Sequence, residues 1–179
     1  MKKYSLLLLF ALILNTLCAQ ELKVNDYPHF RIAVAGGYSH RTAYIASEYK
    51  NGFHYGVELN YYFKIMGIGL NYSGNQFYQG VNIHQFIPTV NMRIFDYEKR
   101  GAFLANIGAG YVGNRNGATI GMLLGLGYDI PLSQTMAIYA QASISGGKLK
   151  RAEYDVFMKE FEYEKLGLLK LSLGLRFAK

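Results

Sequence analysis

A strict alternation of apolar and polar residues runs through the last stretch of the chain, from Leu166 to Lys179. From Leu169 onward every second residue is large and apolar, and the residues between them are small or polar. A period of two predicts a β-strand with one apolar and one polar face. The apolar face of this strand is formed by Leu169, Leu171, Leu173, Leu175 and Phe177.

Seven earlier segments alternate in the same way and are separated by turn residues. The pattern predicts strands over residues 29–44, 52–64, 67–79, 82–95, 101–113, 118–130 and 135–145. Each segment has the roughly 9 to 11 residues that a tilted strand needs to cross a membrane. The chain therefore reads as eight amphipathic strands in succession.

The composition of the polar faces separates two barrel architectures. A soluble barrel of the lipocalin or avidin type would bury the large apolar residues and expose the other face. That face is dominated by Gly, Ser, Asn and Thr, whereas solvent-exposed surfaces carry many mixed charges. A narrow membrane barrel needs small residues in its crowded lumen and apolar residues towards lipid. We therefore predict an all-β protein, an eight-stranded antiparallel up-and-down transmembrane β-barrel, whose closing strand turns its leucines towards lipid.

The first residues of the chain have the features of an export signal. Lys2 and Lys3 precede a short apolar run from Leu6 to Leu14, and the small residue Ala19 stands before Gln20. This pattern predicts a signal peptide over residues 1–19 and a β-barrel domain over residues 20–179. The apolar run is too short for a transmembrane helix. A lipoprotein signal would acylate Cys18, but residues 15–17 are a poor match to the residues that precede such a cysteine.

Composition and charge narrow the possible partners. The only cysteine lies in the predicted signal, so the mature chain would have no disulfide and no thiol ligand. Loss of Lys2 and Lys3 lowers the formal net charge from +7 to +5. The basic residues are spread along the chain rather than gathered in a stripe with aromatic residues. This distribution favours contact with outer-membrane lipids over nucleic acid.

The eight amphipathic runs, the signal ending in Ala-Gln and the final strand ending near Phe177 resemble the small outer-membrane β-barrel family of Gram-negative bacteria, which is porin-like. Residues 106–111 and 124–132 carry the resemblance best. It implies export to the bacterial outer membrane and contact with the barrel-assembly machinery during insertion. In one respect the chain departs from that pattern, because Ala178 and Lys179 follow the aromatic residue on which such barrels often end.

A small set of charged residues falls on the predicted inward faces. Because a buried charge is costly unless it is paired, we predict an interior network with Glu58 and Asp129 as its acidic members. The network would act as a structural plug, and a proton or ion pathway is the alternative. Position along the strands places Glu58 and Lys170 nearer mid-height and the others nearer the periplasmic end. The set is Arg31, Glu58, Arg93, Asp129, Lys170 and Arg176.

The sequence offers little support for catalysis or for a bound cofactor. None of the four histidines has a two-histidine metal spacing, so we predict neither a metal nor another cofactor. A lipid-modifying barrel enzyme would need a serine, a histidine and an acid on one face near the outer leaflet. Ser39, His54 and Glu48 are the one combination that could gather there, and no spacing requires it. We therefore predict that the protein is not an enzyme.

The connections between strands predict the orientation and the functional surface. Short connections at residues 65–66, 96–100 and 131–134 would lie on the periplasmic side, with the chain ends. The connection at residues 146–165 is the longest and most charged. Alternation at Tyr154, Val156 and Met158 suggests a two-stranded ribbon there, and an amphipathic helix is the alternative. We expect a structural or surface-interaction role with an extracellular partner at these outer loops. A narrow pore for ions or small solutes is the second hypothesis. Eight strands leave little open lumen, which favours the structural or surface-interaction role over the pore.

Overall fold

A computed structural model describes residues 29–42, 51–77, 82–96, 101–114, 117–133, 135–150 and 163–178. The predicted signal peptide, Glu48 and residues 151–162 lie outside these ranges. Within them, no helix is long and apolar enough to cross a membrane.

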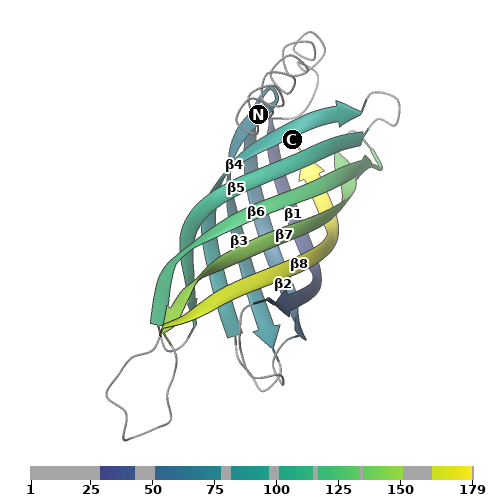
Figure 1. The fold of residues 1–179 in the computed structure, drawn as a ribbon. Helices are drawn as coiled ribbons and strands as arrows, with labels where there is room; N and C mark the ends of the chain where they lie inside the picture. The colour runs from purple at the N-terminus through teal and green to yellow at the C-terminus, as the bar shows by residue number, and fades with distance from the viewer. Residues whose placement is uncertain are drawn as a thin grey trace, which may run out of the picture.

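Eight strands wind obliquely around one axis and close into a single barrel (Figure 1). Each strand is antiparallel to the next, and β1 also pairs with β8. This confirms the predicted all-β, eight-stranded antiparallel barrel. The strands are β1 (Phe30–Arg41), β2 (Asn51–Phe63), β3 (Met66–Phe77), β4 (Asn82–Asp96), β5 (Gly101–Asn114), β6 (Gly117–Pro131), β7 (Met136–Lys150) and β8 (Tyr163–Ala178).

The barrel has two rims, one at each end of the strands. We call the rim at which β1 begins and β8 ends the terminal rim, and the opposite one the loop rim. At the terminal rim β2 and β3 are joined by Lys64 and Ile65, one residue earlier than the predicted turn at residues 65–66. Lys64 has a φ of 62°, in the left-handed region, which lets a two-residue turn close the hairpin.

The surface polarity of the barrel is inverted relative to a soluble protein. On β8, Leu171, Leu173 and Leu175 are 41–64 % exposed, whereas Lys170 and Arg176, which flank this run, are 2–3 % exposed. Large apolar residues also point outward on the other strands, for example Ile120 on β6, which is 78 % exposed. Leu169 is half-buried and Phe177 is exposed, so the predicted closing strand presents its apolar face outward. A soluble barrel is excluded, because it would bury these residues.

Glycine is required where neighbouring strands approach one another closely. A Cβ atom added to Gly37 would collide with the carbonyl oxygen of Leu171 on β8, and one added to Gly108 would collide with that of Pro88 on β4. Both obstacles are backbone atoms, which cannot move aside as a flexible side chain can. The glycines of the inner face therefore allow the tight coiling of a narrow barrel.

The last two strands remain paired beyond residue 145, where the predicted strand over residues 135–145 ends. Residues 146–150 of β7 pair with residues 163–167 of β8, and the pairing ends with Lys150 opposite Tyr163. The strands therefore continue into the predicted loop at residues 146–165, and the amphipathic helix is ruled out for these paired residues. Tyr154, Val156 and Met158 lie outside the described residues.

Candidate functional site in the barrel lumen

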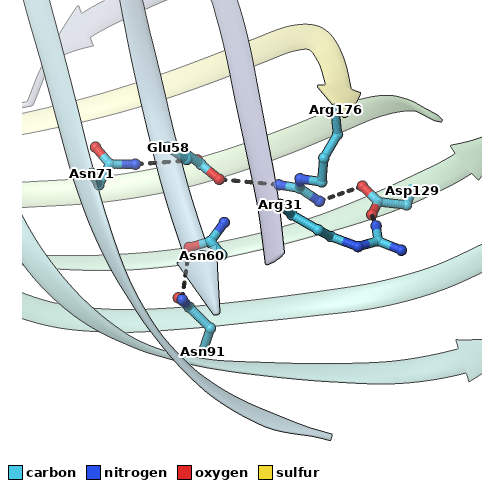
Figure 2. Close-up of polar contacts among 7 residues, drawn as sticks. All are labelled: Arg31, Glu58, Asn60, Asn71, Asn91, Asp129 and Arg176. Atoms are coloured by element: carbon cyan, nitrogen blue, oxygen red, sulfur yellow. Dashed lines mark hydrogen bonds and ion pairs between the residues drawn. The ribbon is translucent and has the colours of Figure 1, made fainter. Parts of the chain in front are cut away.

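Near the terminal rim, the lumen contains a chain of ion pairs contributed by four strands (Figure 2). Arg31 on β1 places Nη1 2.6 Å from Oδ2 of Asp129 on β6. Arg176 on β8 donates to the other carboxylate oxygen of Asp129 through Nη1. Its Nη2 lies 3.0 Å from Oε2 of Glu58 on β2. Arg176 therefore bridges the two acidic residues, and all four side chains face the interior.

Strand register explains why these residues meet. Ala33 on β1 lies opposite Glu58 on β2 and also opposite Arg176 on β8. Glu58 and Arg176 therefore flank the same residue, and the small side chain of Ala33 leaves the space over β1 for their ion pair. Asn71, the partner of Glu58 on β3, donates through Nδ2 to Oε1 at 3.1 Å.

The network is balanced in charge and almost dry. It contains two arginines and two carboxylates, and each of the four residues is at most 9 % exposed. Buried charges with mutual partners are tolerated, whereas removal of one partner from such a pair typically costs about 3–5 kcal/mol. The four residues thus connect β1, β2, β6 and β8 across the lumen. A separate hydrogen bond of 2.8 Å joins Asn91 to Asn60 between β4 and β2 (Figure 2).

Arg93, another member of the predicted set, is buried elsewhere on the terminal rim. Its guanidinium lies over the ring of Tyr62, 4.4 Å from the ring centroid, and 5.1 Å from that of Phe95. Its Nε donates to the carbonyl oxygen of Lys64 at 2.8 Å. Arg93 therefore fixes the turn between β2 and β3 through a hydrogen bond and cation–π contacts.

Lys170 also lies apart from the four-residue network. Its Nζ donates to Oε1 of Gln85 at 2.8 Å and to Oγ of Ser73 at 3.2 Å. Gln85 also hydrogen-bonds to the hydroxyl of Ser145. We call Lys170, Ser73, Gln85 and Ser145 the lysine cluster. It connects β3, β4, β7 and β8 through neutral acceptors, so Lys170 is held without a carboxylate in contact.

Apolar side chains that the strand alternation did not predict fill the lumen towards the loop rim. Gln85 lies between two of them on β4, so this apolar cluster adjoins the lysine cluster. The signal was present where apolar residues are consecutive, as in Met122-Leu123-Leu124, because a run of this kind places apolar residues on both faces of a strand. The cluster consists of Phe77, Ile83, Ile87, Val112, Leu123 and Leu168, each at most 3 % exposed.

The residues considered for lipid chemistry face the lumen. Ser39 and His54 are both buried, and Nε2 of His54 hydrogen-bonds to Oγ of Ser172 at 2.8 Å rather than to Ser39. Glu48 lies outside the described residues. Among the residues that the structure covers, no three His, Cys, Asp or Glu side chains form a group that could hold a metal ion. Ser39 and His54 therefore lie in the barrel interior rather than on the lipid-facing surface.

Comparison with known proteins identifies the fold. No protein-family model matches the chain, and no curated protein matches it in sequence. Among solved structures, Neisserial surface protein A superimposes with a TM-score of 0.64 at 10 % identity, covering 84 % of this chain and 97 % of that one. This is the fold of a small outer-membrane β-barrel.

Two further outer-membrane barrels give the same result. The protein OprG of Pseudomonas aeruginosa has a TM-score of 0.52 at 10 % identity, covering 86 % of this chain and 98 % of that one. Ail, the attachment invasion locus protein of Yersinia pestis, has a TM-score of 0.50 at 14 % identity, covering 84 % and 99 %. Identities this low establish the fold alone. Together with the apolar exterior, the fold supports the predicted location in the bacterial outer membrane.

Proposed function

We propose that the protein is an integral, non-conducting barrel of the bacterial outer membrane that acts through its loop rim. Its role would be structural or that of a surface-interaction protein with an extracellular partner. The observation that carries this proposal is the filling of the lumen. The ion-pair network lies nearer the terminal rim, and the lysine cluster and the apolar cluster lie side by side between it and the loop rim.

The small volume of one cavity within the lumen favours a plugged lumen. A cavity between the network and the lysine cluster has a volume of about 20 Å³, enough for roughly one water molecule. The apolar cluster beyond it would resist the passage of a hydrated ion, because an ion there would lose its water without gaining a polar partner. A narrow pore, the second hypothesis, would need these side chains to move aside.

The strand extension at the loop rim supports a surface role. β7 and β8 remain paired as far as Lys150 and Tyr163, which would carry the connection at residues 151–162 away from the barrel. In sequence this connection is rich in charged and aromatic residues. Two of the proteins with a similar fold are described as a surface protein and an attachment invasion locus protein. An outward-facing loop rim, with the chain ends in the periplasm, agrees with this role.

Two measurements test the proposal. Purified barrel inserted into planar bilayers should give no steady channel events, whereas reproducible single-channel openings would favour the pore. Cells that display the full barrel should attach to surfaces or to other cells more than cells whose barrel has residues 151–162 replaced by a short Gly-Ser linker. Equal attachment, with both barrels at equal amounts in the outer membrane, would count against the loop role.

The proposal assigns no catalytic step to the barrel. Ser39 and His54 are enclosed in the lumen, where an outer-leaflet lipid has no access to them. Purified barrel incubated with outer-membrane lipids should leave their acyl chains unchanged. Altered acyl chains that depend on His54 would contradict this part of the proposal.

A further inference from the structure

Lys170 brings a positive charge into the lumen that the neighbouring ion pairs do not neutralise. Its side chain is enclosed, with the residue 3 % exposed, and its hydrogen-bond acceptors are the neutral groups of Gln85 and Ser73. The ion pairs among the described residues do not include it. Because the four-residue network is already balanced, the network and Lys170 together carry three cations and two carboxylates, a net charge of +1.

The groups around Lys170 are hydrogen-bond acceptors, as a charged ammonium group requires. An ammonium has three N–H donors and no acceptor. Two donors reach Oε1 of Gln85 and Oγ of Ser73, and that amide oxygen also lies within hydrogen-bond distance of the Ser73 and Ser145 hydroxyls. This arrangement offers Lys170 two acceptors and leaves one N–H of the ammonium for a further partner.

The cavity of about 20 Å³ adjoins Lys170 and is lined by further groups that can donate hydrogen bonds. These are the amide of Gln141 and the hydroxyl of Ser143, both on β7. His54 and Ser172 also line the cavity and are hydrogen-bonded to each other at 2.8 Å. Glu58 also lines the cavity, but Arg176 and Asn71 each bind one of its carboxylate oxygens. The cavity thus combines a cation and neutral donors with a carboxylate whose two oxygens are already bound, in a space that fits a single small particle.

We propose that this cavity is a binding site for one halide-sized anion, with chloride as the physiological candidate, which serves as the counter-ion of Lys170. An uncompensated charge inside a barrel surrounded by lipid is strongly unfavourable. An anion in the cavity removes the excess charge and gives the Ser143 hydroxyl and the Gln141 amide a common acceptor. The site is independent of the surface role proposed above, because it lies within the lumen.

Thermal unfolding of barrel refolded in detergent tests this site. The barrel is refolded and melted in chloride or in gluconate at constant ionic strength, since gluconate is too large for the cavity. The melting temperature should be higher in chloride, by about 3–5 °C when chloride exceeds its dissociation constant tenfold. Equal melting temperatures in the two salts at all concentrations would overturn the proposal.

Two variants separate the site from general salt effects. Lys170→Met, which removes the charge at similar length, should melt at the same temperature in both salts. Lys64→Met removes a lysine at the exposed turn and should keep the full chloride dependence of the native barrel. Loss of the dependence in both variants, or in neither, would contradict the assignment to Lys170.

Crystals grown in bromide provide a direct test that needs no variant. An anomalous peak within hydrogen-bond distance of Lys170 Nζ would support the anion site. A peak-free cavity holding only water, with the bromide present in solution, would overturn it.

Discussion

Arg176 on β8 and Glu58 on β2 form an ion pair of 3.0 Å although 118 positions of the sequence separate them. Both residues flank Ala33 of β1, so the pair spans the strand at which the barrel closes. The closing contact between β1 and β8 is therefore strengthened by a third strand. Because Arg176 also binds Asp129, the loss of one member would leave buried charge on the others.

Substitution of Glu58 tests this network. Glu58→Ala should lower the free energy of unfolding by about 3–5 kcal/mol, because Arg176 would lose one of its two carboxylate partners in a dry environment. Urea unfolding of the barrel in lipid vesicles measures the change, and the melting temperature in detergent provides a second value. An unchanged melting temperature would rule out a stabilising role for the network.

Substitutions of two adjacent glycines on β1 test whether the close approach of β8 to β1 requires glycine. Gly37→Ala should destabilise the barrel by about 1–3 kcal/mol, because the new Cβ would collide with the Leu171 backbone carbonyl. Gly36→Ala is the matched control, since its Cβ would meet mainly the ring of Phe53, with a nearest contact of 3.1 Å. Equal effects of the two changes on unfolding would show that the backbone contact is not limiting.

The neighbours Leu123 and Leu124 distinguish lumen packing from lipid contact. Leu123 is 2 % exposed within the apolar cluster, and Leu124 is 53 % exposed on the outer face. Leu123→Ala should cost about 2–5 kcal/mol by leaving a cavity in the lumen. Leu124→Ala should cost less, because lipid chains can fill the space that it vacates. A larger loss for Leu124→Ala, measured by unfolding in the same vesicles, would mean that the two faces are assigned wrongly.

The face of each strand could be predicted from sequence, whereas the grouping of the lumen charges could not. A period of two assigns Leu173 to the outer face and Ser172 to the inner face whatever the neighbouring strands do. Contacts across the lumen depend also on strand tilt and register. Height along the strands placed Glu58 with Lys170 and apart from Arg176, but the register puts Glu58 and Arg176 on either side of Ala33.

The apolar cluster was missed for a different reason. Ile87 and Leu123 lie beside apolar residues on the outer face, so alternation alone does not mark them as inward-facing. The interior of this barrel is therefore more apolar near the loop rim than the glycine-rich and serine-rich faces indicated. This difference favours the proposed plug, because a purely polar lumen would hold water more readily.

The central claim is that the leucine face of the strands contacts acyl chains while the opposite face encloses a filled lumen. Spin labels attached to single cysteines, at Leu173 and Ser172 in turn, test it in reconstituted bilayers. We expect the label at Leu173 to collide freely with dissolved oxygen and little with a water-soluble nickel complex, while the label at Ser172 is immobilised and shielded from both. A label at Leu173 that is accessible to the nickel complex and shielded from oxygen would contradict the membrane-spanning barrel.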